Sequence, residues 1–165
     1  MKYRVIAVLL AALTWDRLFA CSPLIVVPHV LDPEEQKVDR NPPVVPALRV
    51  LKVVRGHDPI TLHGDSYTFD TCADKAVVFV DFTVPPSDDR TPVDKLGVSW
   101  RILRGTPPAG LREPAVFSQA QVVLIDWTER NDKTPVDFTV VVTVRDLAGN
   151  ETTSPPLRVT DAGSK

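Results

Sequence analysis

The residues that could do chemistry gather in one stretch, RGHDPITLHGDSYTFDTCAD, at residues 55–74. Imidazole, carboxylate and thiolate groups are the ligands that proteins offer to zinc and copper. The candidate ligands in this stretch are His57, His63, Asp65 and Cys72. Their spacing matches no established ligand motif, and an exposed loop collects polar residues without any metal. The stretch therefore predicts either a metal or redox site or an ordinary polar surface loop.

Catalytic patterns are absent from the rest of the sequence. There is no G-x-S-x-G, no H-E-x-x-H and no glycine loop that would hold a phosphate. The paired carboxylates Asp88 and Asp89 are explained by a turn between strands. The segment 146–150 offers an aspartate, a backbone carbonyl and an asparagine, which are ligand types that calcium accepts. We expect a protein that is not an enzyme and that uses no cofactor.

Binding partners are only weakly indicated by composition. The net charge is −2, and no basic stripe is interleaved with aromatics, so nucleic acid is disfavoured. Tyr67 or Trp127, if exposed, would suit a sugar-binding or peptide-binding face. Trp127 alternates in phase with Val123 and Ile125, which favours the core instead. The expected partner is therefore an unidentified protein or glycan.

The N-terminal residues 1–20 read as a signal peptide. Lys2 and Arg4 precede an apolar run at 5–15, which is too short to span a bilayer but suits a secretory signal. The run is followed by LFACS, which resembles the lipobox of bacterial lipoproteins. That resemblance implies cleavage before Cys21, lipidation of its thiol and, through Ser22, an outer-membrane location. Ordinary cleavage after Ala20, giving a periplasmic or secreted protein, stays open.

Cys21 can either be lipidated or form a disulfide with Cys72, but not both. In an oxidising compartment Cys21 and Cys72 could form a disulfide closing a loop of about 50 residues, a stabilisation of about 4 kcal/mol in the chain-entropy model. A lipidated Cys21 has no free sulfur for this bond. Any membrane association would then depend on the lipid on Cys21.

The remaining chain divides into a Pro-rich tether at 21–43, a β domain at 44–161 and a short tail at 162–165. Six prolines lie between residues 23 and 46, five of them in the tether, together with a charged patch, so an extended spacer is expected. Apolar and alternating runs predict strands at 48–54, 76–84, 97–103, 120–127, 137–145 and 157–160. Turn-rich connectors separate these runs, which is typical of a β-sandwich. The insertion 55–75 is expected to hold an extra hairpin at 60–69.

The segments TVPPSDDRTPVDKLGVSWRILRG and TPVDFTVVVTVRDLAGNETTSPPLRVT resemble the fibronectin type III pattern and related bacterial Ig-like modules. The resemblance covers residues 44–161. It implies an all-β sandwich of about seven antiparallel strands. It also places Phe82, Trp100 and Phe138 at core aromatic positions and a turn at 146–150. The insertion between the first two strands departs from the family.

Together these features predict a non-enzymatic, exported β-sandwich module for binding or spacing at the bacterial cell envelope. The alternative is a metal-binding or redox protein that uses the loop at 57–74.

Overall fold

The computed structural model describes residues 27–55, 59–62, 65–68, 75–106, 111, 117–118, 122–128 and 135–163. For residues 55, 59–62, 65–68, 75–76, 117–118 and 122–128 the backbone alone is described.

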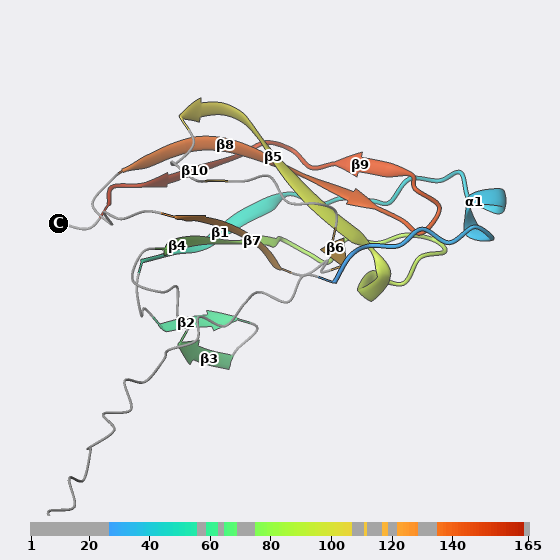
Figure 1. The fold of residues 1–165 in the computed structure, drawn as a ribbon, viewed down its shortest axis with the longest axis horizontal. Coiled ribbons are helices and arrows are strands. Elements are labelled where there is room, and N and C mark those ends of the chain that lie inside the picture. The colour runs from blue at the N-terminus through green and yellow to red at the C-terminus, as the bar shows by residue number, and fades with distance from the viewer. Residues whose placement is uncertain are drawn as a thin grey trace, which may run out of the picture.

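Two antiparallel sheets form the body of the molecule, and they lie in separate layers (Figure 1). The first has the order β1-β4-β7, built from Leu48–Arg55, Lys75–Phe82 and Val122–Thr128. The second has the order β10-β8-β5-β6, built from Leu157–Asp161, Val136–Arg145, Gly97–Thr106 and Phe117–Ser118. β9 (Glu151–Thr153) also pairs with β8. The expectation of an all-β fold is confirmed.

The core fills the space between the sheets because apolar residues alternate along the strands. On β8, Phe138, Val140, Val142 and Val144 are buried in a cluster that also holds Val98 and Trp100 of β5. The first sheet contributes Leu48, Val78, Val80 and Phe82 to the same cluster. The three aromatic residues that the resemblance places in the core, Phe82, Trp100 and Phe138, are all buried there.

β4 is the central strand of its sheet, and both of its faces are buried. Val78, Val80 and Phe82 face the main core, while Val77 and Phe79 on the alternate positions are 3% and 1% exposed. This agrees with the sequence AVVFVDF, in which both faces are apolar except at Asp81, a pattern typical of a strand covered on both sides. Asp81, also on this outer face, pairs with Arg49 of β1 through Oδ2–NH2 at 2.8 Å.

The predicted strands are all present among the described residues, with ends that shift by a few residues. β4 ends at Phe82, two residues before the expected end, and β5 continues to Thr106 rather than stopping at Leu103. The extension of β5 requires a register shift opposite β8, followed by Gly105 at φ +91°. A Cβ at Gly105 would lie 2.4 Å from the Asp137 carbonyl oxygen, so only glycine fits this close approach.

The insertion between β1 and β4 contains the expected hairpin. β2 (Pro59–Leu62) pairs with β3 (Asp65–Thr68) as a separate two-stranded sheet. The short strands β6 and β9 were not expected, because two or three residues carry no usable alternation.

Helical structure within the described residues is limited to α1 (Glu35–Val38) and a 3-10 turn, η1 (Val93–Lys95). None of the helices in this part of the chain has the length and hydropathy of a membrane span. α1 and the end of β10 lie at opposite ends of the sandwich (Figure 1).

Candidate functional site

Three segments meet at the end of the sandwich marked by α1 in Figure 1. They are the N-terminal segment 27–46, the loop 83–96 between β4 and β5, and the turn 146–150 between β8 and β9. We call this region the α1 end. Backbone hydrogen bonds join the segments: Val44 exchanges two bonds with Ser87, at 2.8 and 3.1 Å, and Asp32 N–H donates to the Leu147 carbonyl at 2.8 Å. The segment predicted as a tether is therefore in contact with the domain over its described residues.

Side chains add to these backbone contacts. Asn41 Nδ2 donates to Asp89 Oδ2 at 2.8 Å, and Arg90 Nε pairs with Glu35 Oε2 at 2.6 Å. The hydrogen bond that Arg90 donates to Glu35, together with the negative charge of Glu35, raises the pKa of Arg90, with smaller contributions from the charges of Asp39 and Asp89. Arg90 thus links the loop 83–96 to α1, at a position where several carboxylates gather.

The turn 146–150 is closed by the carboxylate of Asp146, which is fully buried. Its Oδ1 accepts from the N–H groups of Gly149 at 2.6 Å and Asn150 at 2.8 Å, and its Oδ2 accepts from Asn150 Nδ2 at 2.8 Å. Gly149 has φ +98°, a conformation that favours glycine. Both carboxylate oxygens of Asp146 accept hydrogen bonds within the turn. The calcium ligation considered for residues 146–150 would therefore have to compete with these bonds.

A cluster of three aspartates lies at the same end, and its carboxylates are not fully hydrogen-bonded. Asp39, Asp88 and Asp89 each place a carboxylate oxygen within 4.8 Å of the other two, and no other such group of three is found among the described residues. Asp39 is 1% exposed. Its Oδ1 accepts from the Asn41 N–H at 3.0 Å, whereas its Oδ2 is buried and meets no hydrogen-bond donor. Carboxylates arranged in this way are ligands that hard cations prefer.

Asp88, like Asp39, has one carboxylate oxygen that accepts hydrogen bonds and one that has no donor. Its Oδ1 accepts from the N–H groups of Arg90 at 3.0 Å and Thr91 at 2.6 Å, which is the turn role predicted from the sequence. Its Oδ2 is buried and also lacks a donor. The turn therefore accounts for only half of the hydrogen-bonding capacity of this carboxylate.

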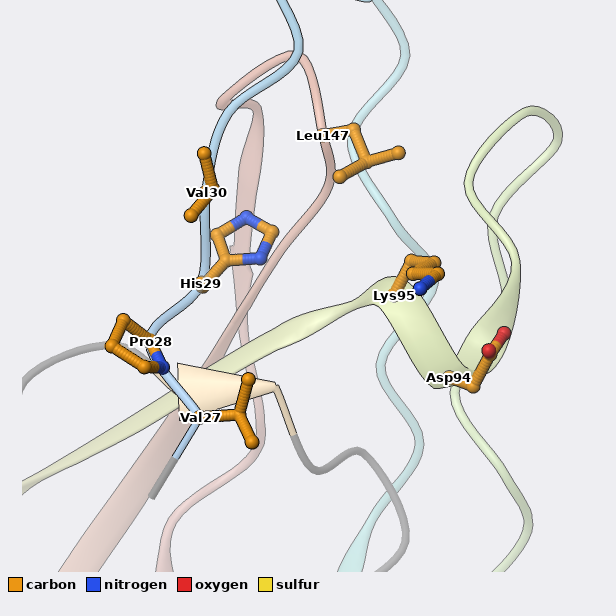
Figure 2. Close-up of a pocket in the computed structure, with 7 residues that line it drawn as sticks. All are labelled: Val27, Pro28, His29, Val30, Asp94, Lys95 and Leu147. Atoms are coloured by element: carbon orange, nitrogen blue, oxygen red, sulfur yellow. The ribbon is translucent and has the colours of Figure 1, made fainter. Parts of the chain in front are cut away.

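A surface pocket of about 410 Å³ lies beside the α1 end and is drawn in Figure 2. His29 points into it from the N-terminal segment, and Asp94 and Lys95 of η1 line the other side. His29 Nε2 donates to the Asp146 carbonyl oxygen at 2.9 Å, which leaves a buried Nδ1 without a partner. The histidine thus acts as a further link between the N-terminal segment and the turn.

Most of the metal ligands predicted from the sequence lie outside the described residues. This holds for His57, His63 and Cys72, and also for Cys21, the predicted lipidation or disulfide site. Asp65 begins β3 opposite Leu62 of β2, and only its backbone is described. The predicted metal loop, the lipid and the disulfide stay predictions.

The acidic cluster was missed because its members are far apart in the chain. Forty-nine residues separate Asp39 from Asp88. The one available signal was that both aspartates precede a proline-containing segment at an expected strand boundary, in DRNPP and DDRTP. That signal indicates a turn and does not indicate that the two turns meet.

No protein-family model matches this chain, and no curated protein or solved structure is significantly similar to it.

Proposed function

We propose that this protein is a non-enzymatic, exported β-sandwich module of the fibronectin type III-like or Ig-like kind, which binds or spaces a partner at the bacterial cell envelope. The strand orders β1-β4-β7 and β10-β8-β5-β6 support it, since they amount to seven antiparallel strands once β9 and the β2–β3 hairpin are set aside. Fold alone does not define a partner, and an unidentified protein or glycan remains the expected one.

The observation that carries the proposal is the docking of residues 27–46 on the loops of the α1 end. Contacts come from the start, the middle and the end of this segment, through His29, Glu35 and Val44. A chain attached at many points moves with the domain. The module is therefore a rigid spacer, and a flexible linker within these residues would require the contacts to break.

Attachment through Cys21 would place this rigid module close to the membrane. Only six peptide units separate Cys21 from Val27, the first described residue. Such a length spans at most about 21 Å when fully extended. A lipid on Cys21 would thus hold the docked domain near the headgroups, in an outer membrane if Ser22 acts as the resemblance implies. Without the lipid the module would be periplasmic or secreted.

Intact mass spectrometry of the mature protein from its host tests the anchor. We expect a chain that starts at Cys21 and carries the added mass of a diacyl or triacyl group. A chain that starts at Cys21 and is lighter by two hydrogens would indicate a Cys21–Cys72 disulfide and no lipid on Cys21.

Hydrogen–deuterium exchange tests the rigid spacer separately. We expect the Val44 and Asp32 amides to exchange slowly, as amides of β8 do, because both donate to backbone carbonyls. Glu35→Gln should speed their exchange by weakening the Arg90 pair. Glu34→Gln is the matched control, because the Glu34 carboxylate is exposed and its ion pair, with Lys37, lies within the N-terminal segment itself. Fast exchange throughout residues 27–46 of the unaltered protein would contradict the proposal.

A further inference from the structure

The buried Asp39 carboxylate is chemically incomplete. Its side chain is shielded from water, and its Oδ2 meets no hydrogen-bond donor. Burying an acceptor without a partner is costly, and burying a charged one costs more. Native proteins contain few such groups, and a bound water or ion is one of the reasons for those that they keep.

Neighbouring protein groups do not supply this partner. The nearby guanidinium of Arg90 is directed to Glu35, with Nε–Oε2 at 2.6 Å and NH2–Oε1 at 3.3 Å. Arg40 donates to backbone carbonyls of Gln36, Lys37 and Asp39 rather than to the Asp39 carboxylate. The Asn41 N–H serves Oδ1 only. Among the residues that the structure describes, none donates a hydrogen bond to this oxygen, which leaves it open to a partner from outside the chain.

The other two carboxylates indicate what that partner is. Asp88 and Asp89 each place one carboxylate oxygen within 4.8 Å of one from Asp39, and Asp89 is the exposed member of the group. The Oδ2 of Asp88 is also buried without a donor. Calcium binds oxygens at about 2.4 Å, so two ligands on opposite sides of the ion lie about 4.8 Å apart. The three carboxylates thus fit around one calcium ion. Water can complete its six to eight ligands from the side of Asp89.

We propose that Asp39, Asp88 and Asp89 form a calcium-binding site that joins the N-terminal segment to the loop 83–96. An all-oxygen ligand set with no imidazole or thiolate favours a hard cation over zinc or copper. Magnesium demands a tighter octahedron and gives up its waters reluctantly, so three carboxylates from two separate loops suit calcium better. Because Asp39 and Asp88 lie on different segments, the ion fastens the docked segment in place.

The site goes beyond the proposed function and does not depend on lipidation of Cys21, since its three ligands lie in the docked N-terminal segment and in the loop 83–96. If the protein proved to be unanchored, the calcium site would stand unchanged.

The test is calcium titration of the purified full chain after treatment with EDTA, at constant ionic strength. We expect calcium to raise the melting temperature by several degrees and magnesium to raise it less. Asp39→Asn and Asp88→Asn should each weaken calcium binding at least tenfold. The matched control is Asp94→Asn, which removes the same charge from an exposed position in η1 at the same end of the molecule. Its response should equal that of the unaltered protein.

Trypsin provides a second readout of the same site. Lys37 and Arg40 are exposed cleavage positions beside Asp39. Calcium should slow cleavage there several-fold in the unaltered protein and in Asp94→Asn, and should have no effect in Asp39→Asn. The proposal is overturned if calcium at about 10 mM, roughly ten times the Kd of the weakest extracellular sites, gives no shift in melting temperature. It is also overturned if Asp39→Asn and Asp94→Asn respond equally, since the effect would then be non-specific.

Discussion

Two buried aspartates at the α1 end differ in how their carboxylates are satisfied. Asp146 is fully buried, and its two oxygens accept three hydrogen bonds from Gly149 and Asn150. Asp39 is equally inaccessible, at 1% exposure, but accepts one bond and leaves Oδ2 without a donor. Burial is the same in both cases, and only the supply of donors differs.

The difference separates a structural carboxylate from a ligand. Asp146 receives its donors from the residues that directly follow it, so the turn is complete as soon as it forms. Asp39 is buried by contact with a distant loop that brings two more acidic residues and no donor. A buried carboxylate that lacks a partner is thus the better indicator of a site than an acidic residue in a familiar turn.

The largest effect is expected at the satisfied aspartate. Asp146→Ala should lower the free energy of unfolding by about 3 kcal/mol, because it leaves the amides of Gly149 and Asn150 without their acceptor. Urea denaturation measures this loss, and it should be the same with calcium and with EDTA. Asp146→Asn, which retains one carbonyl acceptor, should lose less. A loss that appears only in calcium would assign Asp146 to the metal site and undo the comparison.

At Asp39 the expected sign is reversed. In EDTA, Asp39→Asn should raise the free energy of unfolding by about 1–2 kcal/mol, because it removes a buried charge that has no hydrogen-bonded cationic partner. Arg90, which is hydrogen-bonded to Glu35, acts on this charge through electrostatic attraction alone. Urea denaturation in EDTA, with Asp94→Asn as the control, measures the gain. A clear loss of stability in EDTA would show that the Asp39 charge is already compensated within the chain.

The backbone of the turn provides a third test. Gly149→Ala should cost about 1 kcal/mol, because an L-residue at φ +98° is strained. Steric room is not the cause, since the added Cβ would lie 3.6 Å from the Leu31 side chain, an ordinary contact. Gly149→Asn should recover part of the loss, as asparagine tolerates this conformation. Equal stability of Gly149→Ala and the unaltered protein would mean that the turn relaxes freely.

The smallest effect is expected at an exposed carboxylate. Asp137 accepts two hydrogen bonds from Arg158, from Nε at 2.8 Å and NH2 at 2.6 Å, and these lower the pKa of Asp137. A carboxyl with a lowered pKa stabilises the fold above its ordinary pKa and loses this contribution as the pH falls through the lowered value. Water and salt screen the pair, so the effect is slight.

Melting curves of the unaltered protein and Asp137→Asn should therefore differ slightly at pH 7 and coincide at pH 2. Adding 1 M NaCl at pH 7 should also bring them together. A difference that grows towards acid pH would contradict the assigned sign.

Much of the sandwich could be predicted because its information is local. Alternation along 97–103 and 137–145 identified the buried faces of β5 and β8, which hold Trp100 and Phe138 in the core. The run at 76–84 predicted a strand, and its apolar residues on both faces agree with the burial of both faces of β4. Strand ends were less certain, because the extension of β5 depends on the close approach of Gly105 to β8.

The α1 end shows where prediction from sequence stops. Proline and charge between residues 21 and 43 correctly exclude a long helix, but they do not reveal that this segment contacts two loops. The turn roles of Asp88 and Asp146 could be predicted, since their backbone donors lie within four residues.

The sequence by itself thus determined the strands, their buried faces and the turns, because periodicity and short-range hydrogen bonds act between near neighbours. Only the tertiary structure decided that Asp39 lies against Asp88 and Asp89. Docking of the N-terminal segment brings these side chains together, although Asp39 and Asp88 are 49 positions apart in the sequence. Burial and the absence of a donor are properties of the packed chain, so an oxygen that needs a cation can be recognised only after folding.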